Sequence, residues 1–308
     1  MYFSDYLKKC RENYDLTQGD LVVELSHFDE ELFKSLDNVT LSRWELGKSN
    51  PSIARQVRTV EYFQKRGDMV FPCFDESESE MIEKHVCRTG MLNLPGKNKS
   101  LILNFPSSIS IDELSVHQLK DSVMIDEKIT IALDLNKEFS HDHSLIDRER
   151  FKEWTLAPQN LFLLCEYNKQ FFGLLFSLRL KPESFDRLMH FQITQSDITM
   201  EDFADPDEMG CNFILAFFAM NEMAASLLLI RYFAHLISDQ KKIQEIGSMS
   251  THKDAIMLME GINLQRCQSK SYSDDLTRHT YRASLSDVLV NETMIRMLFA
   301  KESCGDER

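Results

Sequence analysis

Residues 40–52 of the 308-residue chain read Thr-Leu-Ser-Arg-Trp-Glu-Leu-Gly-Lys-Ser-Asn-Pro-Ser, and this stretch decides the fold expected for the first part of the chain. Leu41 and Trp44 have the spacing at which two apolar side chains share one face of a helix. Gly47 has the position of a helix terminator, because glycine readily adopts the left-handed conformation that ends many helices. Ser52 is suited to cap a following helix. We therefore expect one short helix to end near Gly47 and another to begin after Ser52.

The segments around this stretch have the spacing of further short helices. Apolar residues recur at helical intervals over 3–14, and Thr17 is a candidate N-cap for a helix over 18–26. Another amphipathic helix is expected over 53–65, with its valines and phenylalanine inward. Between the second and third helices, residues 27–37 are expected to add a helical turn. These patterns predict a small all-α domain.

The two sequence blocks of this region resemble the helix-turn-helix of the Cro/phage-repressor (Xre) family. Leu16-Thr17-Gln18 matches the family's Thr-Gln start of the second helix, and residues 40–52 match its Ser-x-Trp-Glu-x-Gly-x-x-x-Pro end of the third. The resemblance implies a DNA-binding domain over 1–70. It implies that Gln18 contacts the phosphate backbone, that Asn38, Thr40, Ser42 and Arg43 approach base edges, and that Lys48, Ser49 and Asn50 contact phosphates.

The charge distribution is consistent with this resemblance. The whole chain carries a net charge of −14, which opposes nucleic-acid binding unless the sign reverses locally. Residues 38–66 contain six cations and two carboxylates, so the reversal is present in the second half of the expected domain. We expect one of the carboxylates, Glu45, to connect the third helix of this domain to the fourth.

A second, larger domain is expected over 99–308, after an acidic and turn-rich linker over 71–98 that contains a short helix over 79–88. Alternation and apolar runs predict strands over 101–105, 129–135, 161–167, 171–180, 211–220, 243–249 and 263–268. Helical spacing predicts helices over 111–121, 148–154, 223–238, 253–260 and 284–299. The chain is therefore expected to be multidomain, with an α+β second domain built on a largely antiparallel sheet.

The second domain resembles the GNAT acetyltransferase family. Residues 251–264 read THKDAIMLMEGINL and are similar to the family's segment in which an Asn-x-x-Ala helix leads into Tyr-x-x-x-Gly-Phe. Phe172-Gly173-Leu174 is similar to the glycine-containing part of the family's central strand. The order of the expected strands and helices also matches the GNAT fold.

Two departures from the GNAT pattern argue against conventional CoA binding and against transferase activity. The family binds the pyrophosphate of acyl-CoA with a glycine-containing loop at a helix N-terminus. Here residues 221–226 read Asn-Glu-Met-Ala-Ala-Ser, without glycine, and Glu222 places a negative charge near the expected phosphates. The position of the family's substrate-activating tyrosine is occupied by Met257 or Leu258. We therefore expect no cofactor and assign no catalytic residue.

Soft apolar side chains are frequent in the second domain, and core packing is their ordinary role. Some of them are also suited to line an adaptable cleft for an apolar or acyl-bearing effector, at the place where the parallel-type strands splay. The candidates for such a ligand pocket are Phe172, Phe176, Phe217, Met220, Met223 and Met257.

The sequence argues against a metal site, against disulfide bonds and against a membrane-bound or exported protein. His141 and His143 have strand-like spacing and no third ligand motif nearby, so we expect a solvated loop and no metal. The seven cysteines are dispersed and odd in number, which is typical of a reduced protein. With no expected membrane span or signal peptide, the chain is expected to be cytoplasmic and without membrane contact.

The sequence thus favours a transcriptional regulator that binds double-stranded DNA as a homodimer. The GNAT-like domain would dimerise and sense an effector or a partner. Two alternatives remain open: a DNA-binding protein with an active acyl-CoA-dependent N-acyltransferase domain, and a regulator controlled only by a protein partner.

Overall fold

The computed structural model of the chain describes residues 2–67, 113–140, 146–273 and 276–299. The described residues fall into two units, one formed by 2–67 together with 289–299, and the other by 113–288. The linker expected over 71–98, its helix over 79–88, the strand expected over 101–105 and the pair His141 and His143 lie outside the described residues.

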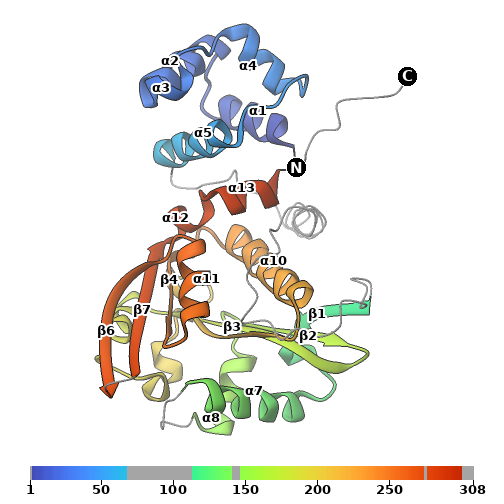
Figure 1. Ribbon diagram of the computed structural model, residues 1–308, viewed down its shortest axis with the longest axis vertical. Helices are drawn as coiled ribbons and strands as arrows, with labels where there is room; N and C mark the ends of the chain where they lie inside the picture. Colours follow the sequence, from blue (N-terminus) through green and yellow to red (C-terminus); the bar gives the residue numbers. More distant parts are fainter. Residues whose placement is uncertain (1, 68–112, 141–145, 274–275, 300–308) are drawn as a thin grey trace. The chain divides into compact units, whose positions relative to one another are not determined.

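The first unit is all-α, as expected. Its N-terminal part contains α1 (Phe3–Asn13), α2 (Gln18–Phe28), α3 (Glu30–Phe33), α4 (Asn38–Glu45) and α5 (Ile53–Arg66) (Figure 1). The short α3 is the additional helical turn expected between the second and third long helices.

Polar side chains cap four of these helices: Thr17 caps α2, Asp29 caps α3, Asp37 caps α4 and Ser52 caps α5. Thr17 forms a capping box with Asp20, in which the backbone amide of Asp20 donates to the Thr17 hydroxyl at 3.1 Å. Asp37 accepts from the amide of Thr40 at 2.7 Å, and Ser52 accepts from the amide of Arg55 at 3.4 Å. After α4, Gly47 has a φ of 63°, so the prediction of a glycine terminator is confirmed.

The end of the described chain belongs to the first unit. The single helix expected over 284–299 is wrong: the structure has α12 (Leu285–Leu289) and α13 (Glu292–Leu298). Asn291 separates them, because its side chain accepts from the amide of Met294 at 2.9 Å and caps a new helix. Phe299, directly after α13, packs its ring centroid 5.2 Å from that of Phe3 and 5.3 Å from that of Tyr6. The expected domain over 99–308 kept this segment with the sheet, whereas the structure groups it with the N-terminal helices.

The second unit is α+β and is built on a seven-stranded sheet in the order β1-β2-β3-β4-β5-β7-β6. Neighbouring strands are antiparallel except for β4 and β5, which are parallel. The strands are β1 (Leu114–Gln118), β2 (Leu161–Tyr167), β3 (Gln170–Leu180), β4 (Gly210–Ala219), β5 (Ile243–Ser250), β6 (Gln265–Ser273) and β7 (Leu276–Ser284). The hairpin expected from 161–180 is confirmed, with both turn residues, Asn168 and Lys169, at positive φ.

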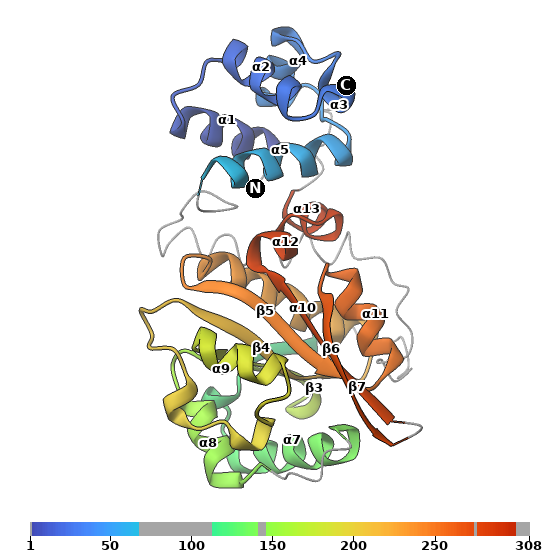
Figure 2. The same ribbon diagram turned by 90° about the vertical axis from the view of Figure 1, so that its left-hand side faces the viewer.

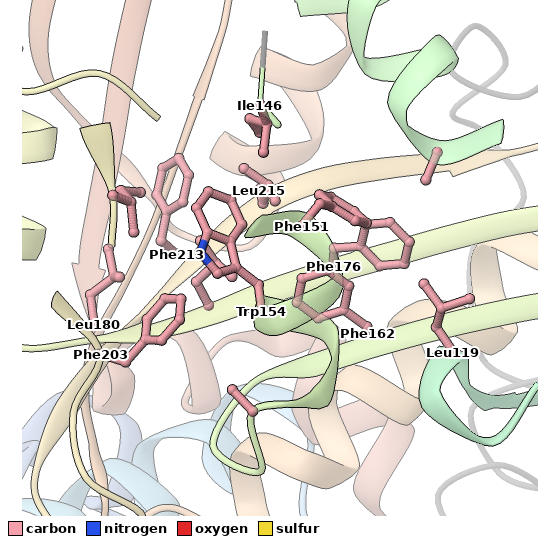
Figure 3. Close-up of a cluster of buried hydrophobic side chains, with 14 of the residues drawn as sticks. Leu119, Ile146, Phe151, Trp154, Phe162, Phe176, Leu180, Phe203, Phe213 and Leu215 are labelled. Carbon is pink, nitrogen blue, oxygen red and sulfur yellow. The ribbon is translucent and has the colours of Figure 1, made fainter. Parts of the chain in front are cut away.

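Helices cover both faces of this sheet (Figure 2). One face carries α7 (Ile125–Ser140), α8 (Arg148–Leu156) and α9 (Pro182–Met189), and the other carries α10 (Glu222–Ser238) and α11 (Lys253–Gly261). The main core lies beneath α8, where Phe151 and Trp154 pack against the strands (Figure 3). There the rings of Phe162 and Phe176 stack with their centroids 4.5 Å apart. The described residues of this unit also include three short 3-10 helices: η2 (Leu119–Asp121), η3 (Gln195–Asp197) and η4 (Met200–Asp202).

Two predicted elements of the second unit are wrong in type. The strand expected over 129–135 lies inside α7, where Ile129 and Ala132 are buried at helical spacing after an acidic first turn. The helix expected over 111–121 contains β1 and η2, because this segment pairs with β2 as an edge strand. The strand β7 and the helix α9 were not expected.

Within the part of the chain that the structure describes, none of the helices combines the length and apolar character that crossing a bilayer requires. The same residues contain no group of three or more His, Cys, Asp or Glu side chains placed to bind a metal ion.

Candidate functional site

The exposed face of α4 is the candidate nucleic-acid surface of the first unit. Leu41 and Trp44 are buried, as the sequence predicts. The opposite face exposes Val39 and Leu46, each with 63% of its surface accessible, and also Arg43. Because these three positions follow one another at helical spacing, they form a single outward stripe.

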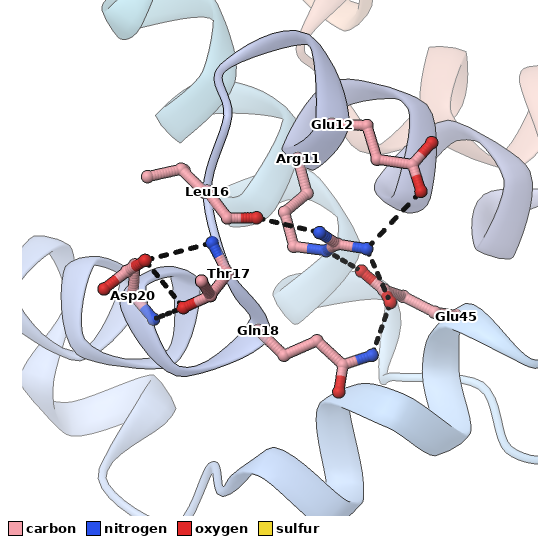
Figure 4. A network of polar contacts seen from close by, with 7 residues as sticks. All are labelled: Arg11, Glu12, Leu16, Thr17, Gln18, Asp20 and Glu45. Atoms are coloured by element: carbon pink, nitrogen blue, oxygen red, sulfur yellow. Dashed lines mark hydrogen bonds and ion pairs between the residues drawn. The ribbon is translucent and has the colours of Figure 1, made fainter.

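The carboxylate of Glu45 connects α4 to α1 and α2 (Figure 4). It accepts from Nε of Arg11 in α1 at 2.5 Å and from Nε2 of Gln18 in α2 at 2.7 Å. The expected connection to the fourth helix, α5, is therefore wrong. The Glu45 side chain is only 5% exposed, so this contact is an internal one. The side-chain amide nitrogen of Gln18, a predicted phosphate contact, is engaged by Glu45.

The N-termini of α2 and α4 lie next to each other. A methyl group added at Gly19 would lie 3.7 Å from Nδ2 of Asn38 and 3.7 Å from the hydroxyl of Thr17. Asn38 is exposed at the start of α4, and Thr40 and Ser42 are partly buried. The helix that carries the predicted base-reading residues, α4, therefore begins beside the start of α2.

Most cations of residues 38–66 are occupied inside the unit. Arg58 pairs with Asp29 at 2.8 Å and also with Glu61, while Arg66 pairs with Glu24. Lys65 lies 2.9 Å from Glu61. The basic patch expected from the sequence is thus smaller than the residue count indicates.

Arg43 and Lys48 are exposed, and neither side chain has a hydrogen bond or ion pair among the described residues. The pKa of Asp37 is lowered by hydrogen bonds from Thr40 and also by the nearby charge of Arg43. The backbone after α4 folds back, with the amides of Lys48 and Ser49 donating to the carbonyl of Arg43 at 2.9 and 3.4 Å. Asn50 is exposed next to them. The sequence did not single out Val39, although an exposed β-branched side chain on such a helix suits contact with a thymine methyl group.

The second unit has a cavity where β4 and β5 separate. The two parallel strands pair only from Gly210 to Ile214, although both continue beyond this point. At the last pair, the hydroxyl of Ser248 donates to the carbonyl of Ile214 at 3.0 Å. Over residues 215–219, β4 pairs with β3 on one side only, so its other edge is open toward the cavity.

The cavity has a volume of about 290 Å³ and mostly apolar walls. Its walls come from α7, β3, β4, α10 and α11, and they include Leu135, Ala216, Phe217, Leu229 and Leu258. All of these elements belong to the second unit.

Of the six residues predicted for the pocket, one, Phe217, lies on the wall of the cavity as formed by the described residues. Phe172 and Phe176 are buried in the packed sheet, with 4% and 1% of their surface exposed. Met220 and Met223 are partly buried elsewhere, and Met257 is 52% exposed. The residue next to Met257, Leu258, is the one that faces the cavity.

Several polar side chains that the sequence did not select line the cavity, and four of them carry an amide, phenol, imidazole or guanidinium group. They are Gln195, Tyr232, His252 and Arg278. Burial raises the pKa of Tyr232, so its hydroxyl stays protonated at neutral pH. His252 directly precedes α11, and its amide donates to the Ser250 hydroxyl at 3.0 Å. Gln195 lies in the segment that follows α9, and Arg278 lies on β7. Neither α9 nor β7 was expected from the sequence.

The start of α10 is capped by its own sequence. The side chain of Asn221 accepts from the amide of Ala224 at 2.8 Å, and its carbonyl accepts from the amide of Ala225 at 3.1 Å. The amide of Ala224, one of the first-turn amides that a helix can direct at an anion, is therefore already used.

Comparisons with known proteins concern the second unit. No model of a protein family matches the chain, and no curated protein matches it. An N-acetyltransferase from Staphylococcus aureus is similar in structure, with 12% identity and a TM-score of 0.38, over 56% of this chain and 98% of that one. An N-acyl amino acid synthase from uncultured soil microbes has 9% identity and a TM-score of 0.38, over 57% and 91%. A ribosomal-protein-alanine N-acetyltransferase from Brucella melitensis has 12% identity and a TM-score of 0.36, over 55% and 99%.

Proposed function

We propose that the second unit binds an acyl thioester and transfers its acyl group to a nitrogen atom. The observation that carries this proposal is the apolar cavity at the separation of β4 and β5. It favours the N-acyltransferase that the sequence left open as an alternative. The GNAT resemblance of residues 251–264 and the mixed sheet with one parallel pair support the same function.

The cavity is suited to both chemically different parts of an acyl thioester, the acyl chain and the amide-containing arm that carries it. An acyl chain gains free energy from leaving water, about 0.8 kcal/mol for each buried CH₂ group, and the apolar walls supply that environment. The open edge of β4 over 215–219 offers backbone groups to an extended amide chain, as an added strand would use them. The pantetheine arm that carries acyl thioesters is such a chain.

The same cavity contains a candidate base. Transfer requires the acceptor amine to lose a proton as its nitrogen bonds to the thioester carbonyl carbon and the C–S bond breaks. We assign this role to His252, the imidazole among the lining residues, since Leu258 has no titratable group and Tyr232 holds its proton too tightly. The departing thiolate then receives the proton that the amine gave up.

The donor is tested in two forms because α10 is capped by Asn221. Purified protein is titrated calorimetrically with dodecanoyl-CoA and with dodecanoyl N-acetylcysteamine thioester, which has the amide arm but no phosphates. We expect the second thioester to bind at least as well as the first. Ala255→Trp, which adds an indole to the cavity wall, should weaken binding at least about tenfold.

Lys253→Trp is the matched control, because Lys253 is exposed on the same helix and does not line the cavity. It should bind like the unchanged protein. Release of free thiol in the presence of amine acceptors then measures transfer. Absence of thioester binding, or equal binding by both variants, would contradict an acyl site in this cavity.

A second function, DNA binding by the first unit, is proposed from a separate observation. Arg43 and Lys48 are exposed, and neither side chain has a hydrogen bond or ion pair with another described residue. Together with the Xre resemblance, this supports contact of α4 with duplex DNA. The sequence hypothesis of a homodimeric transcriptional regulator that senses an effector or a partner depends on this DNA binding.

DNA binding is tested by gel mobility shift with genomic fragments at low salt. Arg43→Ala should lower the affinity for the preferred fragment about tenfold or more, because a lost base contact costs about 1–3 kcal/mol. Lys8→Ala, an exposed cation on α1, is the control and should change affinity much less. If Arg43→Ala binds as the unchanged protein does, α4 is not the reading helix.

A further inference from the structure

Polar atoms without a hydrogen-bond partner are concentrated at one place inside the second unit. Among the described residues, five buried side-chain nitrogen or oxygen atoms have no such partner. Four of them belong to Ser177 and Arg179 of β3, Asn212 of β4 and Tyr232 of α10. These four residues have at most 3% of their surface exposed. Because buried polar groups are almost always hydrogen-bonded, the cluster indicates a small polar ligand at this place.

The three strand residues lie on the face of the sheet that α10 covers (Figure 1). Alternate residues of a strand share one face, so Gly173, Ser177 and Arg179 point to the same side of β3. A methyl group added at Gly173 would lie 3.1 Å from Cδ1 of Leu228 in α10, which identifies this side. Asn212 is directly opposite Arg179 in the pairing of β3 with β4, and therefore shares their face.

The hydroxyl of Tyr232 reaches these strand residues from α10. Burial raises the pKa of Tyr232, and the nearby side chains of Ser177 and Asn212 oppose this shift. The three side chains are therefore neighbours, yet their unpaired atoms do not have the geometry of a direct hydrogen bond to one another. Neighbouring polar groups of this kind are the usual partners of a bridging molecule.

The donors and acceptors of the cluster match a water molecule. Nε of Arg179 and Nδ2 of Asn212 can only donate, whereas the hydroxyl groups of Ser177 and Tyr232 can donate or accept. A water molecule accepts from the first kind of group and donates to the second. Buried waters typically make about three hydrogen bonds, which this cluster can supply.

The local charge favours water over an anion. Burial lowers the pKa of Arg179, and the charges of Asp239 and Asp207 oppose this shift, so carboxylates of the chain already compensate the guanidinium. Nη2 of Arg179 also donates to the carbonyl of Asp205 at 2.8 Å. On the next turn of α10, burial lowers the pKa of His235, so this imidazole adds no charge at neutral pH. A neutral ligand is therefore sufficient.

We propose that Ser177, Asn212 and Tyr232 bind a buried water molecule, with Nε of Arg179 as a further donor at the site. The water connects α10 to both β3 and β4. Because the side chain of Tyr232 also lines the cavity, the water holds one part of the cavity wall in place. The site does not depend on the proposed acyl transfer.

The direction of a stability change tests this site. Tyr232→Phe keeps the ring and removes the hydroxyl, so the thermal midpoint of the second unit in the full-length protein should fall by about 2–5 °C if the hydroxyl bonds to the water. Tyr272→Phe is the matched control, because Tyr272 is 48% exposed on β6, and its midpoint should stay within about 1 °C. Removal of a buried hydroxyl without a partner would instead leave the midpoint of Tyr232→Phe unchanged or raise it, and that result would overturn the proposal.

A crystal structure of the unchanged protein tests the site without any variant. Density for one water should lie about 2.7–3.2 Å from Oγ of Ser177, Nδ2 of Asn212 and the hydroxyl of Tyr232. An anomalous peak at this position after a bromide soak would identify an anion and overturn the water. Direct hydrogen bonds among the three side chains, without density between them, would overturn it as well.

Discussion

A single side chain, Glu45, connects three helices of the first unit. Its carboxylate lies at the end of α4 and accepts hydrogen bonds from Arg11 of α1 and Gln18 of α2. Arg11 also donates to the carbonyl of Leu16 at 2.8 Å, directly before α2 begins. The hydrogen bond that Arg11 donates to Glu45 raises the pKa of Arg11, and the pair is nearly enclosed, with side-chain exposures of 14% for Arg11 and 5% for Glu45. The position of α4 therefore depends on this pair.

We predict that Glu45→Gln lowers the free energy of unfolding of the first unit by about 3 kcal/mol, because it leaves the Arg11 charge without its buried partner. Glu12→Gln is the control: its carboxylate lies 3.7 Å from Arg11 and is 56% exposed, so its loss should cost less than about 0.5 kcal/mol. Urea unfolding followed by circular dichroism measures both. Equal stability of the two variants would show that Glu45 is not a structural connection.

The carboxylates that cap α2 and α4 give the first unit an acid-sensitive stability. Hydrogen bonds from Thr17 lower the pKa of Asp20, and those from Thr40 lower the pKa of Asp37. A carboxyl whose folded pKa is lowered stabilises the fold above its ordinary pKa of about 3.9, and that stabilisation is lost as the pH falls through the lowered value.

We therefore predict that the thermal midpoint of the first unit falls below about pH 4, and that the double variant Asp20→Asn, Asp37→Asn shows a weaker fall. Asparagine at 37 still caps α4, and the amide oxygen of asparagine at 20 can still accept from Thr17, so the variant removes the two charges and keeps the acceptors. Thermal scans between about pH 6 and pH 2 measure the dependence. An unchanged slope would mean that other carboxylates govern the acid response.

Among the helices and strands, those set by local sequence patterns were predicted correctly, whereas those that depend on long-range pairing or packing were not. The hairpin of β2 and β3 and the helix α4 were predictable, since a two-residue turn, caps and a terminating glycine act within a few residues. β1 and α7 were assigned the wrong type. The type of β1 is decided by pairing with β2, and the β-branched run in α7 is helical because one face of it packs against the core.

The candidate cavity was predictable only in outline. The sequence placed an apolar cleft where parallel strands splay, and Phe217 lies on its wall. Gln195 and Arg278 were not found, because the first lies in a loop after α9 and the second on β7, and neither element has a distinct local signal. Polar side chains enter a cavity through the tertiary fold, which brings together segments that are distant in sequence.

Helix α9 packs closely on the sheet at Gly247 of β5. A methyl group at Gly247 would approach Cζ of Phe185 to 2.6 Å and Sδ of Met189 to 2.9 Å. We predict that Gly247→Ala lowers the free energy of unfolding of the second unit by about 1–3 kcal/mol. Gly261→Ala is the control, because nothing lies within 4 Å of the added methyl and alanine is the better helix former. A neutral Gly247→Ala would show that α9 is free to shift.

At the scale of the whole molecule, the first unit is built from both ends of the described chain. Residues 289–299 group with the N-terminal helices, and the buried side chains of Ile295, Leu298 and Phe299 belong to that unit. The intervening residues 113–288 form the second unit. A fragment that ends after α5 therefore lacks part of the apolar surface that covers α1.

We predict that Phe299→Ala in the full-length protein destabilises the first unit by about 3 kcal/mol, since a buried aromatic ring between Phe3 and Tyr6 is removed. Arg296→Ala is the control, because Arg296 is exposed and its ion pair with Glu292 lies on the helix surface. Hydrogen exchange of α1 amides reports on the unit directly. Unchanged exchange in Phe299→Ala would show that α1 does not depend on the C-terminal segment.

The most direct measurement of the central claim, an acyl site between β4 and β5, is a methyl spectrum of isoleucine-labelled protein during titration with dodecanoyl N-acetylcysteamine thioester. Ile214 and Ile262 line the cavity, whereas Ile129 and Ile198 are buried outside its wall. We predict that the signals of Ile214 and Ile262 shift with ligand concentration and that those of Ile129 and Ile198 stay in place. Unshifted signals from Ile214 and Ile262 at saturating thioester would contradict it.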